Sequence, residues 1–249
     1  MKSLFMAGAA SLVLTLAACG GGGGNNASTP VASAPVANVA APNGADWTQT
    51  VSETQLGFLM GNPNAPVKLV EYASITCPHC GEFTTDGGAE GIRNYVRSGR
   101  VSWEYRPFML GFPTDPGLFA LLRCNGAASY FDLAEQLYAD QRNWVTRAQT
   151  FLDQNQASLA NLEGGPRARA IITGAGLDAF FRQRGMTQQQ IDQCLADPRN
   201  LQRVAEDTQR GAQQDNVSGT PTFFINGVQA EGAGLWTQLE PRLRAAVGG

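Results

Sequence analysis

The sequence predicts an α/β fold that is interrupted by an all-helical insertion. Strand, helix and strand patterns follow one another through residues 57–108, and only helical patterns fill residues 116–216. A further strand pattern, a hairpin turn and a last helix close the chain. This order indicates one domain that carries an insertion. We expect the α/β domain to comprise residues 46–114 and 217–249, and the insertion to comprise residues 115–216.

The composition is that of a folded protein. Hydrophobic residues make up 43% of the 249 residues and charged residues 16%, so the chain can bury a normal core. The formal net charge of -3 provides no basic surface, and we therefore expect no nucleic-acid partner.

The first residues are typical of a secretory signal peptide. Lys2 precedes an apolar run from Leu4 to Ala18, which is too short to span a bilayer as a mature helix. The run ends in Leu-Ala-Ala followed by Cys19, which resembles the lipobox of bacterial lipoproteins, where the cysteine becomes acylated. We expect a lipoprotein signal over residues 1–18 and a lipid anchor on Cys19, with ordinary cleavage at an Ala-x-Ala site as the alternative.

Residues 19–45 predict a flexible tether, since they are rich in Gly, Ala, Asn, Ser and Pro and show no hydrophobic period. Gly20 follows the lipobox cysteine, and in lipoproteins the absence of Asp at that position favours the outer membrane. The expected location is the periplasm, with the folded domain anchored by lipid to a membrane.

The α/β domain begins with two expected strands. Residues 57–61 (GFLMG) predict a short first strand, and turn-forming residues follow at 62–66 (NPNAP). The β-rich run 67–73 (VKLVEYA) predicts a central strand. The motif CPHC at 77–80 then opens a helix that is expected to run to Arg97.

This helix contains Gly87 and Gly88, which we expect to weaken or bend it. Residues 101–108 return to a strand pattern. Apolar stripes at helical spacing then start at Phe131 and Trp144, inside the expected insertion.

Capping residues mark two further helix starts in the insertion. Thr187 and Gln190 form a capping-box pattern, and Asp197-Pro198 is a typical N-cap and N1 pair. After the insertion, residues 217–227, including 222–225 (TFFI), predict a strand, and Asn226-Gly227 predicts a hairpin turn into residues 228–230. A final helix is expected over residues 235–247, at the end of the chain.

The chain has five cysteines, an odd number for an exported protein. Acylation of Cys19 leaves four, which divide into the close pair Cys77 and Cys80 and the distant pair Cys124 and Cys194. Three connectivities are possible, and the local pairing is favoured because a short loop closes with little loss of entropy. The distant pair is then expected to form a structural disulfide between two helices, with two buried free thiols as the alternative.

The close pair carries the expected chemistry. Cys77 should lie at a helix N-terminus, where unpaired amides and the helix dipole favour its thiolate. A lowered pKa makes Cys77 a good leaving group, and Cys80, one turn into the helix, should be more buried and resolve a mixed disulfide. His79 is the only histidine, and we expect it to add positive potential or a hydrogen bond near the thiolate. Pro78 limits the loop conformation and suits the first helical position.

Two other uses of a Cys-x-x-Cys pair fit less well. A zinc site needs two more Cys or His ligands, and only Cys124 and Cys194 remain, far apart in the sequence. A purely structural bridge between Cys77 and Cys80 would close so short a loop that it would stabilise little. We therefore expect no metal and no organic cofactor.

Two segments resemble the DsbA family of periplasmic thiol:disulfide oxidoreductases in the thioredoxin superfamily. They are residues 67–80 (VKLVEYASITCPHC) and 219–227 (GTPTFFING), and the resemblance extends over about residues 50–247. It implies a thioredoxin fold with an inserted helical domain, in agreement with the order of elements above. A second disulfide, at Cys124 and Cys194, resembles that of some alphaproteobacterial members.

The resemblance also implies roles for three further residues. Thr220-Pro221 would form a cis-proline loop that faces the active site and pairs with a substrate strand near Thr220. Glu71 would be a buried acid near the disulfide that assists proton transfer to or from Cys80. The best-known oxidase of the family has Val where Thr220 stands, and Thr is also found there in disulfide isomerases.

The leading hypothesis is an oxidase that introduces disulfide bonds into reduced or misoxidised exported proteins and is reoxidised by a DsbB-type membrane quinone reductase. An envelope disulfide isomerase or reductase is the second hypothesis. Such enzymes usually dimerise through an N-terminal domain, whereas only the expected tether precedes the first strand here. A lipid-anchored chaperone or scaffold with a structural pair at Cys77 and Cys80 is the non-enzymatic alternative.

Overall fold

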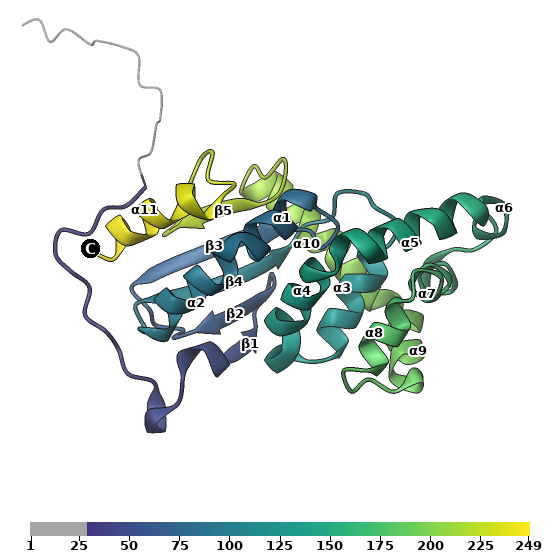
Figure 1. Cartoon of the computed structure of the whole chain (residues 1–249), viewed down its shortest axis with the longest axis horizontal. Helices are drawn as coiled ribbons and strands as arrows, with labels where there is room; N and C mark the ends of the chain where they lie inside the picture. Colours follow the sequence, from purple (N-terminus) through teal and green to yellow (C-terminus); the bar gives the residue numbers. More distant parts are fainter. Residues whose placement is uncertain (1–28) are drawn as a thin grey trace, which may run out of the picture.

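The computed structural model describes residues 29–249, which contain a six-stranded mixed sheet (Figure 1). The strand order is β1-β2-β4-β3-β5-β6; β3 and β4 are parallel and the other neighbours are antiparallel. The strands are β1 (Val51–Glu53), β2 (Phe58–Gly61), β3 (Val67–Ala73), β4 (Val101–Pro107), β5 (Thr222–Ile225) and β6 (Val228–Gln229). The predicted strands are confirmed, except that the one expected over residues 217–227 is confined to β5, and β1 is an additional edge strand.

The parallel pair is joined by a bent helical crossover. It consists of α1 (Pro78–Phe83), the π-helical turn η3 (Thr84–Gly88) and α2 (Ala89–Arg97). Inside η3 the φ angle of Gly87 is 94°, a value that glycine adopts without steric strain. The predicted bend at Gly87 is therefore confirmed.

The chain between β4 and β5 is helical. Its helices are α3 (Asp115–Cys124), α4 (Tyr130–Ala139), α5 (Gln141–Gln154), α6 (Gln156–Leu159), α7 (Gly164–Gly174), α8 (Leu177–Arg182), α9 (Gln188–Ala196) and α10 (Pro198–Gln214). Short 3-10 turns are η1 (Pro42–Gly44), η2 (Trp47–Gln49) and η4 (Ala127–Ser129). The capping box of Thr187 and Gln190 and the N-cap at Asp197 are present as predicted. The predicted disulfide between Cys124 and Cys194 is also present, and it joins the end of α3 to α9.

The main hydrophobic core lies on one face of the sheet. Leu69 of β3 is paired with Trp103 of β4 on one side and with Ile225 of β5 on the other, and all three are buried in this core. Side chains of α1, α2, α4 and the last helix α11 (Trp236–Ala246) belong to it, and the same core continues into further helices between β4 and β5. Tyr72, on the opposite face, packs so closely on α10 that a Cβ at Gly211 would lie 2.6 Å from its ring. Within the described residues no helix is both long and apolar enough to cross a bilayer.

Residues 32–39 follow the surface of the domain (Figure 1). The amide of Ala32 donates to the carbonyl of Ala245 at 3.0 Å, and the amide of Val36 donates to that of Val247 at 2.9 Å. These acceptors lie at the end of α11, where the last carbonyls of a helix have no partner within the helix.

The same segment is bound at a second point. The amide of Val39 donates to the carbonyl of Ser98, directly after α2, at 2.9 Å. The prediction of a flexible tether over residues 19–45 is therefore wrong for this part, because helix-end carbonyls accept hydrogen bonds from it. The expected signal peptide, residues 1–18, and the lipidation site Cys19 lie outside the described residues.

Removing the Cys124–Cys194 disulfide should destabilise the fold. The bridge spans a sequence separation of 70, and in the chain-entropy model its loss lowers the free energy of unfolding by about 4 kcal/mol. Urea unfolding of the double variant Cys124→Ala/Cys194→Ala, with Cys77 and Cys80 held in one redox state, measures the change. An unfolding midpoint equal to that of the unmodified protein would show that this bridge does not restrain the unfolded chain.

Candidate active site

Cys77 lies where β3 ends and α1 begins. It is the N-cap residue of α1, with an extended backbone (φ -72°, ψ 119°), and Pro78 occupies the first helical turn. Cys77 is 3% exposed and Cys80, one turn further along α1, is 0% exposed. Both are free thiols in this structure. The structure therefore brings the two predicted cysteines together at one helix start.

The surroundings of Cys77 favour its thiolate. A hydrogen bond from the Cys80 thiol is the main reason that the pKa of Cys77 falls to about 5. Burial opposes this effect, whereas the Thr220 side chain and the backbone amides of Cys80 and His79 lower the pKa further. These amides belong to the first turn of α1 and have no partner within the helix. Cys77 is thus ionised at neutral pH.

Cys80 and Glu71 hold protons instead. Burial, followed by the contact with Cys77, raises the pKa of Cys80 well above its ordinary value. Glu71 of β3 is 2% exposed, and its Oε2 accepts a hydrogen bond from Trp103 Nε1 at 2.9 Å. Desolvation raises the pKa of Glu71 to about 8, so this carboxyl is mostly protonated at neutral pH. Glu71 is thus buried, as expected.

The loop before β5 faces the exchanging sulfur. The Thr220-Pro221 peptide bond is cis, as predicted, and the Thr220 carbonyl accepts a hydrogen bond from the Cys77 thiol at 3.2 Å. The hydroxyl of Thr220 is buried and has no hydrogen-bond partner among the described residues. It can therefore turn its proton toward the sulfur when Cys77 is ionised.

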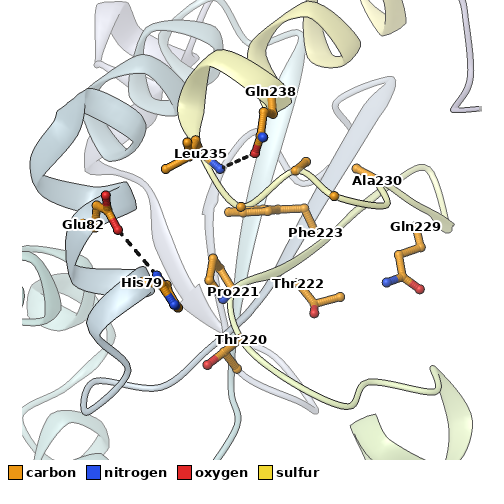
Figure 2. Close-up of a pocket in the computed structure, with 13 residues that line it drawn as sticks. His79, Glu82, Thr220, Pro221, Thr222, Phe223, Gln229, Ala230, Leu235 and Gln238 are labelled. Carbon is orange, nitrogen blue, oxygen red and sulfur yellow. Dashed lines mark hydrogen bonds and ion pairs between the residues drawn. The ribbon is translucent and has the colours of Figure 1, made fainter.

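A cavity of about 530 Å³ opens beside this loop (Figure 2). Its walls are His79 and Glu82 on α1, residues 220–223 and 229–230, and the start of α11 with the segment before it. In Figure 2, Pro221 and Phe223 lie between His79 and Glu82 on one side and Gln229 and Ala230 on the other. The cavity therefore adjoins both the redox motif and the cis-proline loop.

The imidazole of His79 does not reach the Cys77 sulfur. Its Nδ1 lies 3.4 Å from Oε2 of Glu82, and 75% of the His79 side chain is exposed (Figure 2). On a helix, residues two apart point away from each other, whereas residues three apart share a face. The expected imidazole hydrogen bond to the thiolate is therefore wrong, and it is the backbone amide of His79 that acts on the sulfur.

Side chains of the helical insertion hold the loop that precedes α1. Tyr138 of α4 donates its hydroxyl to the Ser74 carbonyl at 3.1 Å. Gln141 of α5 donates its side-chain amide to the carbonyls of Ile75 and Cys77, both at 2.8 Å. No sequence motif points to these residues, because a polar side chain that binds a distant backbone leaves no local pattern.

Asp115, at the start of α3, is a second buried acid, and no sequence motif had indicated it. Its Oδ1 accepts from the Thr76 hydroxyl at 2.8 Å, and its Oδ2 accepts from the Leu110 amide at 3.2 Å. Burial raises the pKa of Asp115 to about 6, and the charge of Cys77 acts in the same direction. Asp115-Pro116 has the pattern of a helix start, but nothing in it points to Thr76.

The site as a whole is suited to thiol exchange. It contains an ionised sulfur, a protonated neighbouring thiol and a protonated buried carboxyl. In residues 29–249 no three side chains of His, Cys, Asp or Glu lie close enough together to hold a metal ion.

Alkylation of the reduced protein should report the low pKa of Cys77. Because only the thiolate reacts with iodoacetamide, the rate should be half-maximal near pH 5, and Cys80 should stay unmodified. Mass spectrometry of peptides after timed exposure between pH 3 and pH 9 measures both sites, and Cys77→Ser is the control. Half-maximal alkylation of Cys77 at pH 8 or above would contradict the prediction.

The thioredoxin family model matches residues 52–243. A protein of Rickettsia bellii (strain RML369-C), assigned by name to the protein-disulfide oxidoreductases, is 26% identical over 174 residues, which cover 70% of this chain and 58% of that protein. The chain thus spans little more than half the length of this relative.

Solved structures show the same fold. The protein-disulfide isomerase from Novosphingobium aromaticivorans is 29% identical, with a TM-score of 0.71, and the match covers 77% of this chain and 97% of that one. Wolbachia pipientis alpha-DsbA1 is 19% identical, with a TM-score of 0.58, over 76% of this chain and 90% of that one. The chain therefore belongs to the thioredoxin family and has the fold of DsbA-like proteins.

Proposed function

We propose that the protein is a thiol:disulfide oxidoreductase that introduces disulfide bonds into other proteins through Cys77 and Cys80. The observation that carries the proposal is the sulfur of Cys77 at the N-terminus of α1, with a pKa of about 5, opposite the cis-proline loop. A dithiol whose reduced form is stabilised in this way is a strong oxidant when it is in the disulfide form.

The first step is formation of a mixed disulfide. A substrate thiolate attacks the sulfur of Cys77 and displaces the sulfur of Cys80, which takes up a proton. Glu71, protonated at neutral pH and close enough to influence the pKa of Cys80, is the proton donor for this step.

The second step releases the oxidised substrate. A second substrate thiolate attacks the substrate sulfur of the mixed disulfide, and Cys77 leaves as a thiolate. Its low pKa makes it a good leaving group. Two electrons have then passed from the substrate dithiol to the pair of Cys77 and Cys80.

Substrate polypeptides are proposed to bind in the cavity of Figure 2. Backbone groups of Thr220 can pair with an extended segment, while Gln229 and Gln238 in the walls offer polar contacts. Recognition through the backbone suits an enzyme that acts on many unfolded chains.

The cellular setting is part of the same proposal. The apolar run before Cys19 and the lipobox resemblance support a periplasmic protein with a lipid anchor, the outer membrane being favoured. Reduced or misoxidised exported proteins would be its substrates, and a DsbB-type membrane quinone reductase would reoxidise it. Metabolic labelling with palmitate, lost in Cys19→Ala, tests the anchor.

An isomerase is the second candidate. Thr220, which is also found before the cis-proline in isomerases, favours it, and the Novosphingobium protein with 29% identity is named a protein-disulfide isomerase. An isomerase must be kept reduced, whereas an oxidase must be reoxidised. The two functions therefore require different reduction potentials of the Cys77 and Cys80 pair.

Equilibration of the Cys77 and Cys80 pair with glutathione separates the candidates. A potential of about -120 mV, as for DsbA, is expected for the oxidase, and a value near -270 mV, as for thioredoxin, would exclude it. The rate of disulfide formation in reduced ribonuclease, with Cys77→Ser as the inactive control, gives the activity. Activity retained by Cys77→Ser would favour a chaperone or scaffold over any exchange enzyme.

Glu71→Gln should make the fold more stable near pH 7. The pKa of Glu71 is about 8 in the fold against an ordinary 4.5, so its contribution to stability is fully present below pH 4.5 and is lost progressively as the pH rises from 4.5 to 8. Glutamine does not ionise, and the variant should gain about 3 kcal/mol near pH 7. Urea unfolding at pH 4, 7 and 9 measures this gain, and stopped-flow kinetics should show slower formation of the mixed disulfide. If Glu71→Gln and the unmodified protein were equally stable at pH 7, the raised pKa of Glu71 would be contradicted.

A further inference from the structure

The loop from Ser74 to Cys77 consists largely of buried residues, and its internal bonds are a turn bond from the Cys77 amide to the Ser74 carbonyl and bonds between Ser74 and Thr76. The helical insertion supplies further donors to its carbonyls: Gln141 binds those of Ile75 and Cys77, and the Cys77 carbonyl also accepts from the Gly81 amide of α1. Buried carbonyls need a donor, and their unpaired burial is unfavourable. Gln141 is therefore the hydrogen-bond donor of the Ile75 carbonyl, and it gives the Cys77 carbonyl a second donor beside the Gly81 amide.

The chemistry of this contact dictates which group can make it. The carbonyl oxygens of Ile75 and Cys77 both lie 2.8 Å from Nε2 of Gln141, so each amide hydrogen has one acceptor. A carboxylate in the same place would have no hydrogen to donate and would repel both oxygens. Among uncharged side chains as long as that of residue 141, only the amide of glutamine can donate a hydrogen bond to both carbonyls.

Gly81 makes room for the amide. A Cβ at Gly81 would lie 2.6 Å from Oε1 of Gln141, closer than real contacts allow. Because Oε1 is the tip of a flexible side chain, a methyl group there would displace Gln141 without breaking α1. Gln141 also lines a cavity of about 840 Å³ on the insertion side of α1, which gives the displaced tip a place to go.

We propose that Gln141 is a positioning residue for thiol exchange: its amide fixes the backbone of Cys77 so that the sulfur stays over the first-turn amides of α1. The Cys77 carbonyl that it binds also accepts from the Gly81 amide at 3.1 Å, which is the first hydrogen bond of α1. Loss of the Gln141 contact frees the cap residue to rotate, and the sulfur then spends less time near the amides of His79 and Cys80. The helical insertion thereby contributes to the reactivity of a cysteine that it does not contain.

The inference rests on exchange at Cys77, but its test does not depend on the direction of electron flow. The thiolate absorbance of the reduced protein at 240 nm gives the pKa of Cys77, and equilibration with glutathione gives the redox equilibrium constant. A Cys77 pKa near that of a free thiol in the unmodified protein would refute the proposed function itself. A low pKa that Gln141 does not affect would refute only the positioning role.

Gln141→Met keeps the length of the side chain and removes both donors. We expect the thiol–thiolate equilibrium of Cys77 to shift about three- to tenfold toward the thiol, the effect of losing one or two neutral hydrogen bonds, and the glutathione equilibrium to become less oxidising by a similar factor. Gln141→Glu adds a charge and should shift both further in the same direction.

Gln149 provides matched controls on the same helix. It is exposed and donates to Asp153 at 2.9 Å. Gln149→Met and Gln149→Glu should leave the pKa of Cys77 and the glutathione equilibrium unchanged. Shifts as large as those of the Gln141 variants would show a general effect of α5 and overturn the proposal.

Gly81→Ala is a second way to break the contact of Gln141 with the two carbonyls, and it does not change Gln141 itself. It should displace the amide and raise the pKa of Cys77, and its effect should disappear in a Gln141→Ala background, where there is no tip to displace. The thermal midpoint of each variant establishes that it is folded. The proposal is refuted if folded Gln141→Met titrates like the unmodified protein, or if Gly81→Ala acts equally in both backgrounds.

Discussion

An ionised sulfur in a place that water barely reaches is the constraint on which this structure depends. Burial alone would keep Cys77 protonated, and only donors that have no other partner can reverse that preference. The first turn of a helix supplies such donors, so the sulfur has to occupy the cap position of α1. β3 lies between β4 and β5, and this central place in the sheet delivers the cap to the cis-proline loop, whose Thr220 carbonyl is 3.2 Å from the sulfur.

The helical insertion supports that position from the other side. Its side chains bind the carbonyls before α1. The position of the cap residue Cys77 therefore depends on how the helices of the insertion pack. That packing is close. A Cβ at Gly174 would lie 2.3 Å from the ring of Phe151, and one at Gly165 would lie 2.5 Å from the Leu195 carbonyl. Glycines here allow helices to approach, although they weaken the helices in which they stand.

The sequence predicts those features whose cause is local. The redox motif at Cys77, the capping box and the bend at Gly87 each follow from a few neighbouring residues, and the resemblance supplied the cis-proline loop. Contacts across the fold had no such signal. Asp115 and Gln141 meet the active-site loop only after the insertion has folded against the sheet, and the glycine-rich helix α7 has low intrinsic propensity and forms through packing. His79 was assigned to the sulfur by its place in the motif, but helical geometry turns its ring away.

The path of the N-terminal segment determines how the active site is presented. Val67 pairs with Val101, so the end of α2, to which Val39 is bound, lies beside the start of β3, while Cys77 follows the end of that strand. The seven residues of β3 put about 23 Å between these two ends. The bound segment and the sulfur of Cys77 therefore lie toward opposite ends of β3. A polypeptide that approaches Cys77 therefore meets an end of the domain that residues 32–39 do not cover.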